Sequence, residues 1–307
     1  MMKHFVFRIA LFSLFALMLF TGIYLLSDQM INLRKKHFFK VNKNVNIVFA
    51  GDSNIACSVN DSLIPHSVNL ASNGETYMYT YYKLKNLFEY NPQIKTVFLN
   101  YTYSNIDIAS ETYFLYSKEH LTDKNSSFNY LLGQNEKHLL FFHNPLGYIL
   151  SLQLAVQKNI TRICKTFTGS NQDIRDYNFG RYYFLDRHKV DEDIYHCFFR
   201  EWTFTKSDIQ LYYLKMISDL CKEHSVLLVL LKPPAHPFNK YFLVQEMKRS
   251  WTIIQKEQLK DSLLDFTTLP IPDSCYSDLA HLNYKGARIF SKQLNAVIES
   301  NKRVVKP

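Results

Sequence analysis

Glycine is scarce in this chain, since only 8 of its 307 residues are glycine and only 2 are tryptophan. So little glycine excludes collagen-like sequence and speaks against flexible linkers, and the chain shows no internal repeat or low-complexity tract. Tyrosine and phenylalanine are abundant (21 and 24), and 47% of all residues are hydrophobic. This composition is sufficient for the packed core of one large domain or two small ones.

Cysteine is also sparse, and its five positions are widely spaced without a C-x-x-C pair: Cys57, Cys164, Cys197, Cys221 and Cys275. This spacing excludes a dense disulfide scaffold and offers no metal-site pattern. The histidines show no H-E-x-x-H spacing either, so we expect no metal and no other cofactor. We expect Cys57 and Cys275 to be small buried hydrophobic residues, with a contact between them as the alternative.

Acidic residues are outnumbered by basic ones, 27 to 36, which gives a formal net charge of +9. The excess is spread along the chain rather than gathered with aromatic residues, so we expect no nucleic-acid partner. A cationic surface beside anionic lipid or an acidic glycan is the more modest interpretation.

One long and nearly continuous apolar run opens the chain, from Phe5 to Leu26, and it is broken by Arg8. At about 1.5 Å per helical residue it is long enough to cross a hydrocarbon core of about 30 Å, and Arg8 lies close enough to its end to reach the membrane surface. A cleaved signal peptide is the alternative, but the segment after Gly22 lacks a small-x-small cleavage pattern. We therefore expect a transmembrane anchor over residues 1–30 and a juxtamembrane segment over 31–44.

The orientation of this anchor is ambiguous from charge alone. Lys3 and Arg8 precede the end of the apolar run, but more basic residues follow it: Arg34, Lys35, Lys36 and Lys40. A simple count by the positive-inside rule would place the bulk of the protein in the cytoplasm.

Strand and helix patterns alternate after the anchor. Short apolar runs predict parallel strands at Asn46–Ala50, Ser67–Ala71 and Ile94–Asn100, with a helix over Thr76–Glu89 that ends before Asn91-Pro92. Later in the chain the same reasoning predicts helices over Thr205–Glu223, Lys248–Leu259 and Tyr284–Glu299, and strands at Val226–Leu231 and Leu263–Phe266. This alternation indicates an α/β domain over residues 45–307.

The stretch of about 108–204 interrupts this rhythm, because it is rich in Tyr, Phe, Asn and His without a clear period. We interpret it as an inserted cap. Its aromatic side chains could stack on sugar rings or form a satellite core, and the sequence leaves both open.

Two polar motifs lie at opposite ends of the α/β pattern. Gly51-Asp52-Ser53 follows the first strand directly, and Asp278 precedes His281 by three residues near the C-terminus. A serine hydroxyl becomes a nucleophile when an imidazole takes its proton, and that imidazole needs a carboxylate to fix its tautomer. Each motif alone also fits an ordinary turn or a helix cap. Together, and in this order, they predict a hydrolytic triad.

These motifs resemble the SGNH (GDSL-like) hydrolase family, through Gly51-Asp52-Ser53, the segment Asn69–Gly74, and Asp278-x-x-His281 with Gly286 after it. The resemblance covers roughly Asn46–Asp107 and Val226–Ser300. It implies an SGNH-like, flavodoxin-like three-layer α/β fold with a parallel sheet.

The same resemblance implies roles for single residues. Ser53 would be the nucleophile, His281 the base and Asp278 its orienting acid, and Gly74 with the Ser53 amide would hold the oxyanion. The family's Gly-x-Asn-Asp after the third strand is absent here, and the segment 97–107 stands in its place. Asn105 is the expected oxyanion asparagine, with Asn100 as the alternative.

The resemblance also implies a function: ester hydrolysis or acyl transfer, with acetyl as the expected acyl group, on an envelope or exported polysaccharide. On this ground we expect the domain outside the cytoplasm, against the charge count. Asp52, Lys232 and His236 are candidate substrate-binding residues, the last two on the loop after the strand at 226–231. The alternative is a non-catalytic binding or assembly partner of a membrane O-acyltransferase, with the serine site degenerate.

Overall fold

The structure is a computed structural model that describes residues 2–167, 179–197, 204–238 and 262–300. Its residues form two compact units. Residues 1–38 and 118–172 make a helical unit, and residues 39–117 and 173–307 make an α/β unit. The stretch expected as one inserted cap is therefore divided between the two units.

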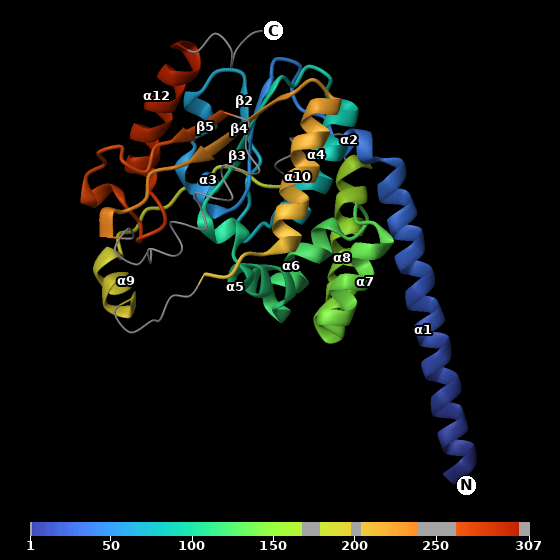
Figure 1. The fold of residues 1–307 in the computed structure, drawn as a ribbon. Helices are drawn as coiled ribbons and strands as arrows, with labels where there is room; N and C mark the ends of the chain where they lie inside the picture. Colours follow the sequence, from blue (N-terminus) through green and yellow to red (C-terminus); the bar gives the residue numbers. More distant parts are fainter. Residues whose placement is uncertain (1, 168–178, 198–203, 239–261, 301–307) are drawn as a thin grey trace. The chain divides into compact units, whose positions relative to one another are not determined.

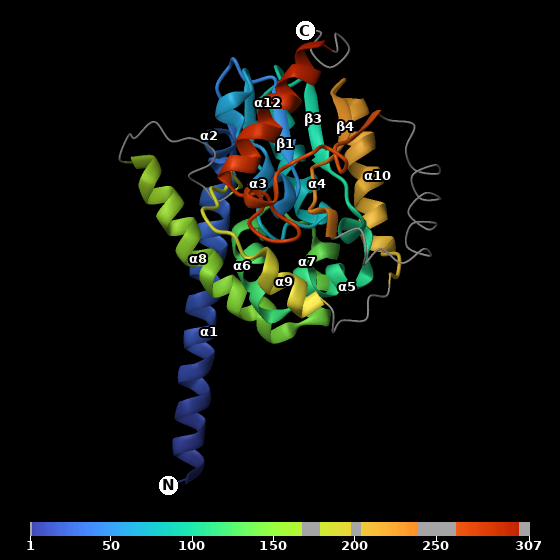
Figure 2. The same cartoon turned by 90° about the vertical axis from the view of Figure 1, so that its left-hand side faces the viewer.

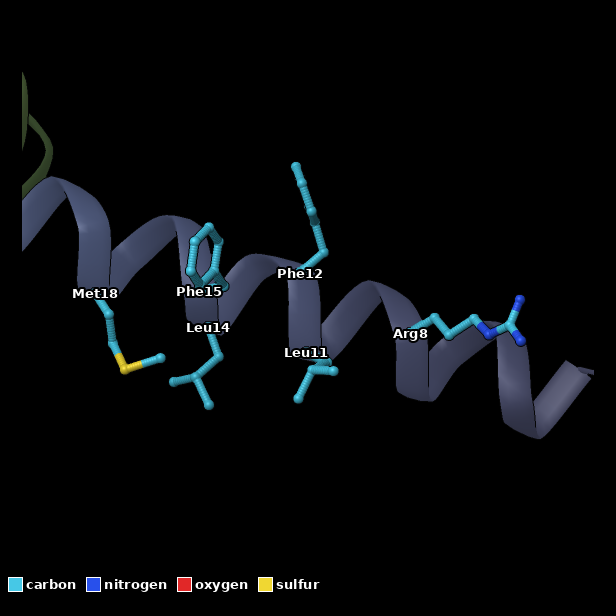
Figure 3. Close-up of a pocket in the computed structure, with 6 residues that line it drawn as sticks. All are labelled: Arg8, Leu11, Phe12, Leu14, Phe15 and Met18. Carbon is cyan, nitrogen blue, oxygen red and sulfur yellow. The ribbon is translucent and has the colours of Figure 1, made fainter.

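The helical unit begins with α1 (Met2–Leu33), which leads into the short α2 (Lys35–Phe39). Three further helices complete it: α6 (Lys118–Phe128), α7 (Gln134–His143) and α8 (Pro145–Phe167). Among the described residues α1 is the one helix long and apolar enough to cross a membrane, and none of its most apolar 18-residue window is buried. Figure 3 shows the Arg8 side chain extending along the helix toward its N-terminal end, away from Leu11 and Met18.

The last third of α1 is part of the helical unit rather than a free extension. Ser27 and Ile31 are buried, and the Tyr24 hydroxyl donates to Asn129 Oδ1 at 2.5 Å. The Arg34 guanidinium lies 4.4 Å from the centre of the Phe167 ring, at the C-terminal end of α8. The N-terminal half of α1 extends past the other helices of its unit in both views (Figures 1 and 2).

The α/β unit contains a five-stranded parallel sheet in the order β2-β1-β3-β4-β5, one of the two common orders of doubly wound sheets. The strands are β1 (Ile47–Ala50), β2 (Ser67–Asn69), β3 (Thr96–Asn100), β4 (Leu227–Lys232) and β5 (Ser262–Asp265). The four residues of β1 and the five of β3 are all buried, as expected for strands covered on both faces. The predicted α/β class with a parallel sheet is confirmed.

Two layers of helices cover the sheet. One face carries α3 (Ser53–Ser58) and α12 (Tyr284–Ser300), whose apolar side chains join those of Phe49, Phe98 and Val229 in one core. The opposite face carries α4 (Tyr77–Tyr90) and α10 (Asp208–Glu223), which pack on each other (Figure 1). The connections hold shorter elements: η1 (Asp61–Leu63), η2 (Tyr103–Ile106), α5 (Ile108–Glu111), η3 (Thr112–Tyr116), α9 (Val190–Cys197) and η6 (Asp273–Cys275).

Element boundaries differ from the predicted ones where side chains compete for backbone groups. β2 ends at Asn69 rather than Ala71, because Asn69 Oδ1 accepts the Ala71 N–H at 2.9 Å and forms a turn. α10 begins at Asp208 rather than Thr205, because Ser207 Oγ caps it by accepting the Gln210 N–H at 3.0 Å. The helix predicted over Lys248–Leu259 lies outside the described residues.

A fully buried ion pair fastens α4 to the sheet. Lys83 Nζ lies 2.7 Å from Glu75 Oε2, and both side chains have no exposed surface. The ammonium also donates to the Leu70 carbonyl beyond β2 and, at 2.9 Å, to the Phe179 carbonyl. A buried charge is tolerated only when it is paired and hydrogen-bonded, and here each proton of the ammonium has an acceptor.

We predict that Lys83→Met lowers the free energy of unfolding by about 3–5 kcal/mol, because it leaves the Glu75 carboxylate buried without its cation. Lys85→Met is the matched control on the same helix: Lys85 is exposed, and its loss should cost less than about 0.5 kcal/mol. Denaturant titration in detergent measures both. Glu75→Leu combined with Lys83→Met should cost less than the sum of the single changes, and strict additivity would contradict this account.

Candidate active site

The serine motif lies on a turn that only glycine can make. Gly51 follows β1 with φ of +127°, and a Cβ placed there would come within 2.5 Å of Asn100 Cβ on the neighbouring strand. Residues that have a Cβ rarely adopt this backbone conformation, so the close approach of the ends of β1 and β3 depends on glycine. Asp52 then caps α3, with Oδ1 accepting the Asn54 N–H at 2.8 Å, and Ser53 becomes the first residue of the helix.

The acid and the base lie on one tight loop before α12. Asp278 Oδ1 accepts the backbone N–H groups of Ala280 at 3.0 Å and His281 at 2.8 Å, which folds the chain back on the carboxylate. The Ser277 N–H donates to the His281 carbonyl at 2.8 Å and closes the loop. This local geometry presents the His281 ring to its own acid.

The fold joins the two motifs across 228 residues of sequence. His281 Nδ1 lies 2.8 Å from Asp278 Oδ1, and His281 Nε2 lies 2.8 Å from Ser53 Oγ. An ionised carboxylate only accepts, so Nδ1 carries the proton and Nε2 presents its lone pair to the serine hydroxyl. This is the tautomer that can take the hydroxyl proton. The distance that a shared site requires is therefore present.

Hydrogen bonding keeps the acid ionised. Burial alone would raise the pKa of Asp278, but the hydrogen bond from the His281 ring, the charge of that ring and the two backbone N–H groups outweigh it, so the pKa is lowered. Arg187 adds a cation that the sequence pattern did not reveal: its Nη2 lies 3.4 Å from Asp278 Oδ2, and its Nε donates to Ser277 Oγ at 3.0 Å.

Arg187 is delivered by an extended segment that we call the strap, residues 179–189. The strap runs past both motifs: the Tyr183 N–H donates to the Ala56 carbonyl of α3 at 2.7 Å, and the Lys189 N–H to the Ser277 carbonyl at 2.7 Å. A Cβ at Gly180 would lie 2.2 Å from the Leu70 carbonyl oxygen, so this contact also depends on glycine. The strap lies in the aperiodic stretch of the sequence, where no pattern marks it.

Asp52 gathers the amide groups that surround the serine. Asn100 Nδ2 donates to Asp52 Oδ1 at 2.7 Å, and Asn105 Nδ2 donates to Asp52 Oδ2 at 2.8 Å. Burial raises the pKa of Asp52, even though the hydrogen bonds from Asn54 and Asn105 and the charge of His281 act to lower it. The carboxylate ties the loop after β1 to the loop after β3. Asp52, a candidate substrate contact, thus has its oxygens occupied by protein amides.

The two candidate oxyanion asparagines differ in how many of their amide protons are already hydrogen-bonded. Asn100 Nδ2 spends both of its protons, on Asp52 and, at 3.0 Å, on Asn105 Oδ1. Asn105 Oδ1 also accepts the Thr102 N–H at 2.8 Å, which fixes the orientation of the Asn105 amide. Asn105 Nδ2 then donates one proton to Asp52 and, within the described residues, keeps the other unengaged. This favours Asn105 over Asn100 as an oxyanion donor.

The backbone N–H groups of Ser53 and Gly74 are further candidates for oxyanion donors. Gly74 lies on a turn with φ of +64° that is held beside the serine loop, because the Ser72 N–H donates to the Gly51 carbonyl at 3.0 Å. Among the described residues, the N–H groups of Ser53 and Gly74 have no hydrogen-bond acceptor. The buried pair Glu75–Lys83 starts one residue after Gly74 and fixes this turn.

Lys232 and His236 are turned to other carboxylates. Lys232 Nζ lies 2.9 Å from Asp265 Oδ2, and His236 Nε2 lies 2.7 Å from Asp273 Oδ1. The His236 backbone N–H reaches the Leu279 carbonyl at 3.3 Å, so its loop supports the acid loop from behind. These contacts with Asp265 and Asp273 stabilise loops, and neither of them involves the Ser53 hydroxyl.

The two cysteines nearest the serine and acid motifs are buried. Cys57 and Cys275 are buried free thiols, and burial, followed by the charges of Asp278 and Asp52, raises the pKa of Cys57 to about 12. A thiol in this state is a poor nucleophile at neutral pH. The described residues contain no group of three or more His, Cys, Asp or Glu side chains arranged to hold a metal ion.

Comparison with known proteins adds one partial match. A family model of an uncharacterised family matches residues 186–303, which is less than half of the chain. The matched segment contains Asp278 and His281 and excludes Ser53. No curated protein matches the chain.

Asp278 and Asp52 should give opposite pH dependences of stability. The folded-state pKa of Asp278 is lowered, so the ionised Asp278 carboxylate increases the free energy of unfolding above about pH 4. This stabilisation is lost as the pH falls through the folded-state pKa. The folded-state pKa of Asp52 is raised, so the ionised carboxyl reduces stability as the pH rises above about 4.

Unfolding midpoints measured from about pH 3 to pH 7 test this. The stability difference between wild type and Asp278→Asn should grow with rising pH below about pH 4. The stability difference between wild type and Asp52→Asn should shrink as the pH rises above about 4. Parallel curves for both variants would contradict the two assignments.

Proposed function

We propose that this protein is a membrane-anchored serine esterase or O-acyltransferase of the SGNH type. Its substrate would be an O-acyl group, with acetyl expected, on an envelope or exported polysaccharide. The observation that carries the proposal is the unbroken hydrogen-bonded chain from Ser53 Oγ through His281 to Asp278. The serine and the histidine come from opposite ends of the sequence, and a chance pair of turn motifs would not require them to meet.

The proposed reaction starts at Ser53. Its Oγ attacks the acyl carbonyl carbon while His281 Nε2 takes the hydroxyl proton, and Asp278 stabilises the resulting imidazolium. The N–H groups of Ser53 and Gly74 and the second N–H of Asn105 would bind the oxyanion. His281 then gives its proton to the departing sugar oxygen, which leaves an acyl-serine. Water or a second sugar hydroxyl attacks that ester, with His281 again as the base.

The position of the site supports this proposal. Ser53 follows β1 and Asn100 ends β3, and these neighbouring strands are where the strand order reverses. Open α/β sheets bind their ligands in the crevice at this switch point, beyond the carboxyl ends of the strands. The strand order also agrees with the flavodoxin-like layout that the family resemblance implies.

Labelling with a fluorophosphonate probe tests the nucleophile. Wild type should be labelled and Ser53→Ala should not. Ser58→Ala is the matched control on the same helix: its hydroxyl is buried and, among the described residues, has no hydrogen-bond partner, so labelling should persist. Ser53→Ala, His281→Ala and the double variant should each lose ester-cleaving activity by several powers of ten, to nearly the same level.

Asn105→Ala should lower turnover by about a hundredfold, through loss of one oxyanion donor. If Ser53→Ala leaves acetate release and glycan acylation unchanged while deletion of the whole chain alters the glycan, the protein is an assembly partner and the catalytic proposal is wrong.

We further propose that α1 is a retained single-pass anchor and that the α/β unit lies outside the cytoplasm. The hydrogen bond from the Tyr24 hydroxyl to Asn129 supports retention, because cleavage after Leu26 would remove Tyr24 from the helical unit. The extracytoplasmic side rests on the family resemblance.

Membrane fractionation tests the anchor: the protein should stay with membranes in high salt and at alkaline pH, and should leave them only in detergent. A mature N-terminus after Leu26 would contradict the anchor. For the side, Cys164 is an exposed free thiol, so in a Cys197→Ser background an impermeant maleimide should label it in intact cells with a permeabilised outer envelope. Cys164→Ser is the control, and labelling only after lysis would place the protein in the cytoplasm.

A further inference from the structure

Large apolar side chains are exposed to solvent at the turn between α7 and α8. Phe142 is 77% exposed, Leu146 59% and Ile149 48%, and Phe141 next to them is 37% exposed. We call these four residues the α7–α8 tip. Phe141 packs its ring against Tyr148, with centroids 5.9 Å apart, so the tip is a fixed part of the helical unit. Contiguous exposed apolar side chains of this kind mark a contact with a partner or a membrane.

Hydrogen bonds place the tip at one level of α1. The Tyr24 hydroxyl donates to Asn129 Oδ1 at 2.5 Å, and Asn129 Nδ2 donates to the Tyr148 hydroxyl at 3.2 Å. Leu146 and Ile149 lie within one helical turn of Tyr148. The opposite end of α8 lies by Arg34, further along α1. The tip is thus at the end of the helical unit from which the free half of α1 emerges, as Figures 1 and 2 both show.

This level coincides with one boundary of the apolar run. α1 is exposed throughout from residue 2 to residue 19, and its apolar run ends at Leu26, two residues after Tyr24. With α1 across a bilayer, the segment around Tyr24 would lie at the membrane–water boundary. Aromatic side chains are enriched there, and a turn with two phenylalanines at this level meets headgroups and the first acyl carbons.

We propose that the α7–α8 tip enters the interfacial layer of the same membrane that α1 crosses, so that two contacts hold the helical unit. A lipid surface is favoured over a protein partner because the tip belongs to the same compact unit as α1 and lies at the level where the apolar run of α1 ends. The proposal goes beyond the catalytic function and rests on α1 being in the membrane. With two contacts to the membrane, the helical unit could not rotate freely about the axis of α1.

Depth-dependent quenching in the full chain tests the proposal. The native tryptophans Trp202 and Trp251 are replaced by Phe, and Phe142→Trp adds one probe at the tip. Phe167→Trp is the matched control, since Phe167 is 70% exposed and lies at the opposite end of α8. Both proteins are reconstituted in vesicles that contain lipids brominated near the carbonyl end of the acyl chains.

The probe at position 142 should emit at shorter wavelength, lose emission to the brominated lipids and be shielded from aqueous iodide. The probe at position 167 should be quenched by iodide and not by the lipids. Equal iodide quenching at both positions would overturn the proposal. A blue shift at position 142 without lipid quenching would show a protein neighbour and would also overturn it.

Alkaline extraction of the same vesicles separates this result from failure of the anchor. A protein that stays in the vesicles with an iodide-accessible probe at position 142 contradicts the tip contact alone. A protein that leaves the vesicles removes the premise of both proposals.

Discussion

The Asp52 carboxylate is the interaction on which the candidate site depends. It accepts amide protons from Asn54, Asn100 and Asn105, and so joins the end of β1 to the end of β3. A parallel sheet brings these two ends to one edge, but nothing in the sheet itself fixes the loops beyond them. Because Ser53 is the next residue, the position of its hydroxyl follows from the same hydrogen bonds. The carboxylate therefore fixes these loops, and in the proposed mechanism its amide partners, rather than its own oxygens, would face the reacting groups.

The buried ion pair Glu75–Lys83 fixes two further segments of the site, the turn at Gly74 and the strap. Glu75 and Lys83 have no exposed surface, and the ammonium reaches the end of β2 and the start of the strap. The turn at Gly74 and the segment that carries Arg187 are thereby tied to one cation. Buried ionic groups are weak sources of stability, but they penalise every arrangement that leaves them unpaired. At this site they would specify loop positions, and a preorganised oxyanion site needs such fixed donors.

The sequence was sufficient for the strands and for the two motifs, but not for the groups that hold them. The apolar runs at Asn46–Ala50 and Val226–Leu231 predict strands because parallel strands are buried on both faces. Asp278 and His281 can be paired from the sequence because they lie on one short loop, where a small separation in sequence keeps two residues close in space. Arg187 has no such local signal, since its partner lies 91 residues away. The choice between Asn100 and Asn105 needed the direction of each amide, which is set by tertiary contacts.

Water has direct access to the proposed base, because the His281 side chain is 24% exposed and the neighbouring Arg187 side chain 53% exposed. In such a site the acyl-serine would partition between water and any sugar hydroxyl that reaches it. Transfer would win only if an acceptor chain lies over Ser53 and displaces that water, since hydrolysis is otherwise favoured by the concentration of water. Binding of the acceptor, rather than any change in the triad, would then separate a transferase from an esterase on this scaffold.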